Sequence, residues 1–164
     1  MTMPLVGIVM GSDSDWPLVQ KAADTLKAFG VAYEVRVMSA HRTPDLACAY
    51  ASEAAQRGLR VVIAAAGLAA HLGGVLAAHT PLPVIGIPMP GGPLNGQDAL
   101  YATVQMPSGI PVATVGIGNA TNAALLAIQI LGTADESLRA KFMDYKATMR
   151  QKVIEADAKL NASL

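Results

Sequence analysis

The sequence predicts a single α/β domain, residues 1–164, with a five-stranded parallel sheet covered by helices on both faces. Three observations support this fold class. Short apolar runs alternate with stretches of helical periodicity along the chain, which is typical of repeated strand and helix units. Most of these runs are apolar throughout, as expected of strands that are buried on both faces. The length of 164 residues is close to the usual size of one domain.

The first part of the chain supplies two strands, each followed by a helix. Residues 4–10 are an apolar run that predicts a buried strand, and apolar residues at helical spacing predict a helix over residues 15–29. Residues 31–38 alternate in polarity and predict a second strand. Thr43 is expected to cap a helix that ends near Gly58, because a proline and an acidic residue follow it.

The middle of the chain continues this alternation and adds a loop of unusual composition. Residues 60–66 predict the third strand, residues 69–78 a short helix, residues 82–88 the fourth strand and residues 110–117 the fifth. After the fourth strand, residues 89–96 are rich in glycine and proline, which makes them too flexible for a core. We expect this segment to form a wall or a lid of a binding site.

The end of the chain predicts two helices, from about residue 121 to 131 and from residue 135 to about 160. At 1.5 Å per residue the second would be about 39 Å long, more than a domain of this size needs. Hydrophobic residues make up 52% of the chain and charged residues only 15%, against about 25% charged in ordinary proteins. We therefore expect a homo-oligomer, with residues 135–160 packed on a neighbouring subunit.

The composition argues against several classes of function. Basic and acidic residues are equally numerous, 12 of each, so no net field favours nucleic acid or a membrane surface. The single cysteine, Cys48, offers neither a disulfide framework nor a metal cluster, and it fits the reducing cytoplasm as a small packed residue. We expect no signal peptide, because the N-terminus lacks a positive leader. Residues 61–84 are the most apolar stretch, but histidine, glycine and proline interrupt it too often for a membrane span.

The candidate site residues follow the strands, where parallel sheets bind their ligands. After the first strand the chain reads GSDSDW. Gly11 permits a sharp turn, and Ser12 and Ser14 offer hydroxyl groups. The amides at the start of the following helix favour an anion such as phosphate. The alternative is an ordinary helix cap, in which Asp13, Ser14 or Asp15 binds those amides instead.

The segment SAHRTP follows the second strand. Arg42 can bind a phosphate through two parallel hydrogen bonds, and Ser39 can add a third. His41 can take up and return a proton near neutral pH. The alternative is structural: Arg42 pairs with a surface acid, and His41 packs as a half-buried ring.

The segment AAAGLAAHLGG follows the third strand. Its small residues, among them Gly67, Ala69 and Ala70, leave backbone amides open to a flat ligand, and His71 adds a second imidazole. The alternative is helix packing with His71 as a core histidine. His79, at the end of the same predicted helix, is expected to cap it.

Five segments together resemble one family. They are GSDSDW, SAHRTP, AGLAAHL, DALYATVQMPSGIPVAT and TNAALLAIQIL. Their order and spacing, across nearly the whole chain, are similar to those of the PurE family of purine biosynthesis. The resemblance implies a flavodoxin-like three-layer αβα sandwich with a five-stranded parallel sheet and a long C-terminal helix. It also implies an octamer in which that helix packs on a neighbouring subunit.

The resemblance further implies an isomerase that works without a metal or an organic cofactor. The expected activity is that of an N5-carboxyaminoimidazole ribonucleotide mutase, whose substrate carries a carbamate on the exocyclic nitrogen. The carbamate loses carbon dioxide, the site holds the gas, and carbon four of the imidazole ring takes it up to give 4-carboxy-5-aminoimidazole ribonucleotide. The ATP-dependent synthase that makes the carbamate is the implied functional partner.

The family's functional residues can be carried over to this sequence one by one. His41 matches the proton shuttle. Ser12, Asp15 and Arg42 match the serine, aspartate and arginine that bind the substrate, so Asp15 is expected at the ribose and Arg42 at the phosphate. His71 and the backbone of residues 67–70 match the pocket for the carboxylate and carbon dioxide.

The chain also departs from the family's pattern. Leu68 occupies a place where many members have glycine, Gly73 one where proline is usual, and GIGNATNAALL is shorter than the common form. A sister branch carboxylates aminoimidazole ribonucleotide directly with free carbon dioxide and is the alternative activity. That branch typically has lysine after the histidine and lacks AAHL, so Arg42 and His71 favour the mutase. A receiver-like signalling module would need an aspartate at the end of the third strand, where residues 64–67 are alanine and glycine.

Overall fold

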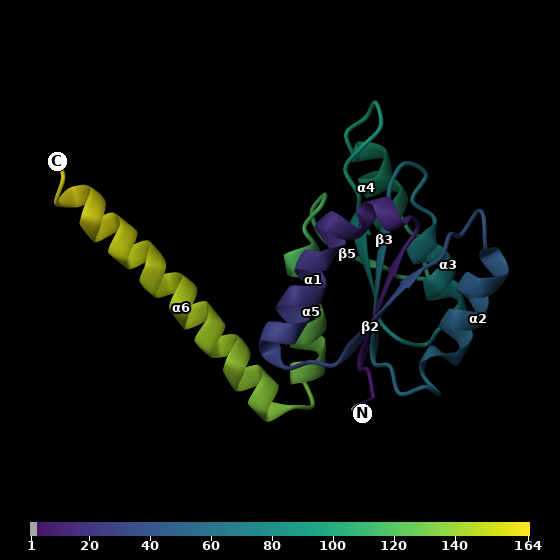
Figure 1. Cartoon of the computed structure of the whole chain (residues 1–164), viewed down its shortest axis with the longest axis horizontal. Helices are drawn as coiled ribbons and strands as arrows, with labels where there is room; N and C mark the ends of the chain where they lie inside the picture. The colour runs from purple at the N-terminus through teal and green to yellow at the C-terminus, as the bar shows by residue number, and fades with distance from the viewer. Residues whose placement is uncertain (1–2) are drawn as a thin grey trace. The chain divides into compact units, whose positions relative to one another are not determined.

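The computed structural model describes residues 3–164, in which five parallel strands form one sheet (Figure 1). The strands are β1 Val6–Met10, β2 Tyr33–Val37, β3 Val61–Ala66, β4 Val84–Pro88 and β5 Ala113–Thr114. They lie in the order β2-β1-β3-β4-β5, with Val6 of β1 paired to Tyr33 of β2 and to Val61 of β3. This order is the doubly wound arrangement of flavodoxin-like folds, so the predicted fold class is confirmed.

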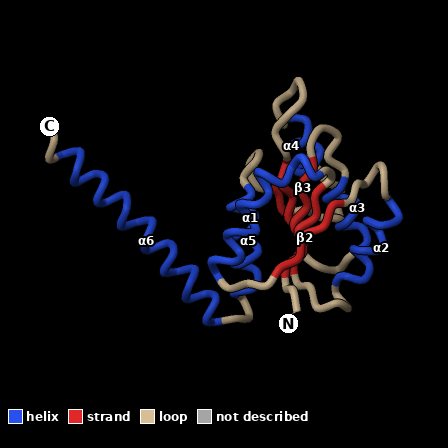
Figure 2. Tube along the Cα trace, viewed as in Figure 1, coloured by secondary structure: helices blue, strands red, loops and turns tan. Residues whose placement is uncertain are grey.

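Helices cover both faces of the sheet. The helices of the chain are α1 Trp16–Phe29, α2 Pro44–Ala54, α3 Leu72–His79, α4 Gln97–Val104, α5 Ala120–Gly132 and α6 Glu136–Asn161, and a 3₁₀ turn η1 lies at Asp13–Asp15. The helix α1 and residues 120–127 of α5 lie on one face, and α2 and α3 lie on the other (Figures 1 and 2). On the second face, α2 and α3 bury Val9, Val62 and Val84 of β1, β3 and β4.

Two glycines in the strands let helices approach the sheet closely. A Cβ atom on Gly7 of β1 would overlap Tyr50 Oη of α2, and one on Gly86 of β4 would overlap Thr103 Cγ2 of α4. Tyr50 and Thr103 are buried, so neither side chain can turn away without losing its packing. The two glycines therefore fix how near α2 and α4 lie to the sheet.

Two of the predicted elements are shorter in the structure because the backbone turns. The helix predicted to end near Gly58 ends at Ala54, and a turn with Gly58 at a φ of 93° follows it. The helix predicted from residue 69 begins at Leu72. The His71 amide donates to the Ala69 carbonyl at 2.9 Å, a turn tighter than a helical turn, and Leu68 just before it has a left-handed backbone with a φ of 55°.

The third departure is the fifth strand, for which the sequence predicts residues 110–117. It is only two residues long, Ala113–Thr114, and it lies at the edge of the sheet beside β4. Pro111 has no amide hydrogen to donate to a neighbouring strand, which prevents pairing further toward the N-terminus. The structure also adds α4, which begins after Gly96 in a stretch where the sequence predicts no element of its own.

The chain forms two compact units, one up to Ala127 and the other Ile128–Leu164. The second contains α6, whose first turn is capped by Asp135: its Oδ1 accepts a hydrogen bond from the Leu138 amide at 2.9 Å. The predicted bounds of this helix are confirmed. Several of its apolar side chains are exposed, namely Met143, Met149, Val153, Ile154 and Leu160. Packing of α6 on a neighbouring subunit stays a prediction. None of the helices in residues 3–164 is both long and apolar enough to cross a membrane.

Candidate functional site

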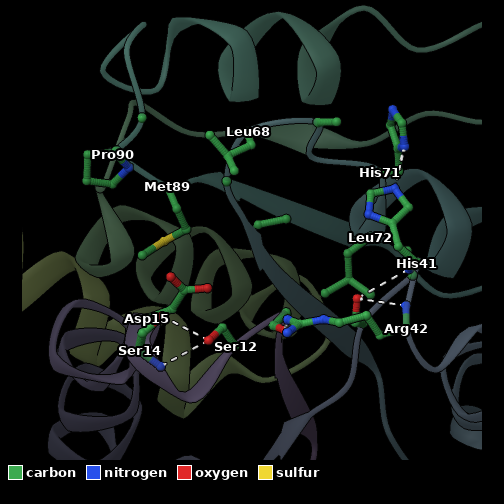
Figure 3. Close-up of a pocket in the computed structure, with 18 residues that line it drawn as sticks. Ser12, Ser14, Asp15, His41, Arg42, Leu68, His71, Leu72, Met89 and Pro90 are labelled. Carbon is green, nitrogen blue, oxygen red and sulfur yellow. Dashed lines mark hydrogen bonds between the residues drawn. The ribbon is translucent and has the colours of Figure 1, made fainter.

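Four loops meet at the carboxyl ends of the strands and enclose a pocket of about 590 Å³ (Figure 3). They follow β1, β2, β3 and β4. The sequence analysis predicts site residues in the loops after β1, β2 and β3, and a wall or lid of the site in the loop after β4. The volume lies within the range of about 300–1,000 Å³ typical of small-molecule sites.

All but one of the predicted site residues line this pocket. Those that do are Gly11, Ser12, Ser14, Asp15, Ser39, His41, Arg42, Gly67, Ala69 and His71. The exception is Ala70, whose surface is only 2% exposed and lies outside the lining. The residues from Met89 to Gly92 form one wall, as expected for the glycine-rich loop, and Leu72 adds an apolar surface that the sequence does not predict. Only its place next to His71 could have indicated it.

Ser12 organises the loop after β1. Its Oγ accepts hydrogen bonds from the Ser14 amide at 3.3 Å and from Ser14 Oγ at 2.8 Å, and it donates to Asp13 Oδ1 at 3.3 Å. Ser12 is thus the cap of the 3₁₀ turn that leads into α1. The alternative in which Asp13, Ser14 or Asp15 caps the helix is wrong, because the side chain that caps this turn is Ser12 and the Asp15 side chain makes no capping hydrogen bond at the start of α1.

The carboxylate of Asp15 is therefore available to a ligand in the pocket (Figure 3). Burial raises the pKa of this carboxyl above its ordinary value, the charge of Asp13 adds to the rise, and a hydrogen bond from the Ser12 backbone opposes it. A ligand that donates hydrogen bonds to Asp15 would replace the water that the charged form has lost.

Arg42 joins the loops after β1 and β2. Its Nη2 donates a hydrogen bond to the carbonyl oxygen of Gly11 at 2.8 Å. Its recorded partner is thus a carbonyl group and not a surface acid. An arginine has five N–H donors, so most of them can still bind an anion. Ser39 shapes the same loop, since its Oγ accepts hydrogen bonds from the amides of His41 at 3.3 Å and Arg42 at 3.2 Å.

The two imidazoles form a pair. His41 Nε2 and His71 Nδ1 are 2.8 Å apart, and their rings are nearly perpendicular, with an interplanar angle of 85°. One nitrogen donates and the other accepts, according to the tautomers present. The loops that carry them follow β2 and β3, which are not neighbours, so the pair spans the end of β1. Both side chains are exposed at the pocket, and neither the half-buried His41 nor the core His71 of the structural alternatives is found.

The pocket has a polar side and an apolar side. Figure 3 shows Ser12, Asp15 and Arg42 along one side and Leu68, Met89 and Pro90 along the other, with the two histidines at one end. Gly67, in the loop after β3, lies close to the loop after β4, since a Cβ atom on Gly67 would be 3.4 Å from Met89 Cβ. This arrangement suits a ligand with a charged, hydroxyl-rich part and a flat, less polar part.

The other histidine, His79, ends α3 outside this pocket. Its Nε2 lies 3.3 Å from Sγ of Cys48 on α2, a half-buried free thiol. Within residues 3–164, no three histidine, cysteine or acidic side chains are grouped so that they could hold a metal ion.

Comparison with known proteins places this chain in a family. The family model described as AIR carboxylase matches residues 5–152. An N5-carboxyaminoimidazole ribonucleotide mutase from Mycobacterium tuberculosis is 55% identical over 157 residues, which cover 96% of this chain and 90% of that protein. A phosphoribosylaminoimidazole carboxylase from Saccharomyces cerevisiae is 52% identical over 160 residues, which cover 98% of this chain and 28% of that protein.

The fold of the chain agrees with these relatives. A crystal structure of Treponema denticola PurE matches it with a TM-score of 0.87 and 36% sequence identity, over 96% of this chain and 98% of that one. The matched residues 5–152 include every residue that lines the pocket. On this evidence, the chain belongs to the AIR carboxylase family, which is the PurE family.

Proposed function

We propose that the protein is an N5-carboxyaminoimidazole ribonucleotide mutase of purine biosynthesis. The observation that carries this proposal is the 2.8 Å contact between His41 Nε2 and His71 Nδ1 in a pocket with one polar and one apolar side. A mutase must move a proton to and from its substrate and must also hold carbon dioxide. The relatives named as mutases, 55% identical over nearly the whole chain, support the same activity.

The polar side of the pocket suits the ribose phosphate of the substrate. Arg42 supplies the cation for the phosphate, and the hydroxyl groups of Ser12, Ser14 and Ser39 add neutral donors. Asp15 accepts hydrogen bonds from the ribose hydroxyls, a task left open to it because Ser12 caps the helix. The imidazole base then points toward the two histidines and the apolar wall.

The histidines serve two proton transfers of opposite direction. The N–C bond of the carbamate breaks, carbon dioxide leaves, and the exocyclic nitrogen receives a proton from His41. Carbon four of the ring then attacks the carbon dioxide, a C–C bond forms, and the proton of carbon four returns to His41. The proton released in the second step equals the one consumed in the first, so no other acid or base is required. His71 fixes the tautomer of His41 through their hydrogen bond.

Direct carboxylation of aminoimidazole ribonucleotide is the second candidate, favoured by the carboxylase from Saccharomyces cerevisiae. One assay separates the two. The protein is given the carbamate nucleotide without bicarbonate and, in a second vessel, aminoimidazole ribonucleotide with abundant dissolved carbon dioxide. The mutase converts the first efficiently, and His41→Asn protein in the first vessel is the control for spontaneous reaction. Efficient conversion in the second vessel alone would establish the carboxylase instead.

The proposal includes assembly as an octamer that works in the cytoplasm. Exposed apolar residues on α6 support an interface, among them Met143, Val153 and Leu160, with 61%, 69% and 60% of their surfaces exposed. The ATP-dependent synthase that forms the carbamate would act immediately before this enzyme. Because the carbamate is labile, the two enzymes need to share a compartment.

A further inference from the structure

Leu68 combines two features that are unfavourable for a leucine. Its backbone is left-handed, with a φ of 55°, and 56% of its surface is exposed. Such a conformation is disfavoured for residues with a Cβ atom and persists only where the surroundings hold it. None of the binding and proton-transfer roles above uses this side chain, although it lines the pocket.

The side chain of Leu68 lies against the glycine-rich loop that follows β4. A Cβ atom built on Gly92 would lie 2.5 Å from Leu68 Cδ2, so the leucine fills the space that a side chain at residue 92 would need. Gly92 itself has a φ of 64°. The contact thus joins the loops after β3 and β4 on the apolar side of the pocket, where Figure 3 shows Leu68 near Met89 and Pro90.

Backbone hydrogen bonds anchor the base of the loop after β4. The Met89 amide donates to the Ala66 carbonyl at 2.8 Å, and the Gly118 amide donates to the Pro88 carbonyl at 2.8 Å. At the tip the backbone bonds are local: the Asn95 amide donates to the Gly92 carbonyl at 3.3 Å, and the Gln97 amide donates to the Leu94 carbonyl at 3.0 Å. The tip, residues 91–95, therefore depends on side-chain contacts to stay at the pocket, and Leu68 provides one of them.

We propose that Leu68 is a positioning residue that holds the tip of the 89–96 loop at the pocket while carbon dioxide is free inside. This role rests on the mutase activity proposed above. Carbon dioxide is small and uncharged, so walls retain it better than charged groups do. The left-handed backbone fixes the direction of the leucine side chain, and a glycine in the same place would provide neither the contact nor the restraint.

Two variants of Leu68 and one matched control test the contact without any substrate. Leu68→Ala removes the side chain, Leu68→Gly also frees the backbone, and Leu46→Ala removes a leucine of α2 with a similar exposed fraction of 55% outside the pocket. Hydrogen–deuterium exchange of the amides of Gly91, Gly92, Leu94 and Asn95 is measured in the free protein. Both Leu68 variants should exchange at least about threefold faster, because a lost contact lowers local protection, and Leu46→Ala should match the wild type.

The second measurement tests whether the released carbon dioxide stays in the pocket. The carbamate nucleotide is converted in buffer that contains carbon-13-labelled bicarbonate, and the labelled fraction of the product is determined. An opened pocket lets unlabelled gas escape and labelled gas enter, so the Leu68 variants should give at least about threefold more label and release more aminoimidazole ribonucleotide. Their midpoint of thermal unfolding and their mass by light scattering should equal those of the wild type or, for the midpoint of Leu68→Gly, exceed it.

The outcomes separate the parts of the proposal. Unchanged exchange at residues 91–95 overturns the contact, and faster exchange with unchanged label overturns its role in retaining the gas. A smaller assembly mass by light scattering in the Leu68 variants would mean that Leu68 lies at a subunit interface. This result also overturns the proposed role. If the wild type converts neither nucleotide, the mutase activity fails and the gas-retention role fails with it, while the exchange data still decide whether Leu68 holds the loop.

Discussion

Arg42 donates a hydrogen bond from Nη2 to the carbonyl oxygen of Gly11 at 2.8 Å, which ties the loop after β2 to the loop after β1. The bond orients the guanidinium group along the polar side of the pocket. A phosphate bound there would thus meet a cation whose position is already fixed, and less side-chain entropy would be lost on binding.

Replacing Arg42 should weaken substrate binding more than it slows the bound reaction, because the phosphate is remote from the reacting carbon. For Arg42→Ala the lost charge-assisted contact should cost about 1.5–3 kcal/mol, which corresponds to a KM about 10- to 150-fold higher. Steady-state kinetics measure this change. Arg42→Lys is the control, because lysine keeps the charge but cannot donate two parallel hydrogen bonds to a phosphate. An unchanged KM for Arg42→Ala would contradict the placement of the phosphate.

The half-buried carboxyl of Asp15 should make the protein less stable at neutral pH. Burial raises its pKa, so the charged form is less favourable in the folded chain than in the unfolded one. Asp15→Asn should therefore have a higher free energy of unfolding than the wild type at pH 7. This difference should shrink as the pH falls through the raised pKa and vanish below the ordinary value of 3.8, as urea unfolding across a pH series can show.

The same variant tests the contact with ribose. Asn keeps one acceptor oxygen, so Asp15→Asn should raise KM only a few-fold, and removal of a ribose hydroxyl from the substrate should harm the variant less than the wild type. Equal harm in both proteins would mean that Asp15 does not bind the ribose.

His41 is expected to carry the proton transfers. His41→Asn keeps polarity and approximate volume but cannot titrate, so turnover should fall at least about 100-fold, the lower range for loss of a general acid–base. Binding of the nucleotide, measured by calorimetry, should survive. His71→Asn is the control and should cost less, because it removes the partner and leaves the shuttle. Near-normal turnover in His41→Asn, or a larger loss in His71→Asn, would refute the assignment.

Removing residues 135–164 should break the predicted oligomer. On α6 the residues Leu138, Phe142, Tyr145 and Met149 recur at helical spacing, and Leu138 is buried whereas Met149 is 43% exposed. Light scattering should report a smaller assembly, and the shortened chain should be less soluble. A truncated protein that keeps the mass expected for the full oligomer would show that this helix does not hold the subunits together.

Gly7 should tolerate no side chain, because a Cβ atom there would overlap the hydroxyl of the buried Tyr50. Gly7→Ala is expected to lower the free energy of unfolding by about 1–3 kcal/mol, as overpacking of a core does. Gly11→Ala is the control for stability, since a Cβ atom on Gly11 would have nothing within 4 Å. Equal denaturation midpoints for the two variants would contradict the close approach of α2 to β1.

The sequence was sufficient to predict the first four strands and most lining residues, because a distinct motif follows each of these strands. It could not predict the contact between His41 and His71, which depends on β1 lying between β2 and β3. Ala70 shows a second limit: composition marks it as a small residue, but only packing decides that it is buried outside the pocket. Leu68 shows a third, because a left-handed φ at a leucine contradicts local preference.

Ser12 caps the turn before α1, and Asp15 makes no capping bond with its side chain. Structural and recognition tasks are thus divided between neighbouring residues of one short loop. Residue 15 can consequently vary without loss of the helix start, so libraries randomised at this position should contain many folded members. The loop gives directed evolution a route to altered sugar preference in which mutations at residue 15 do not first have to be offset by stabilising changes elsewhere.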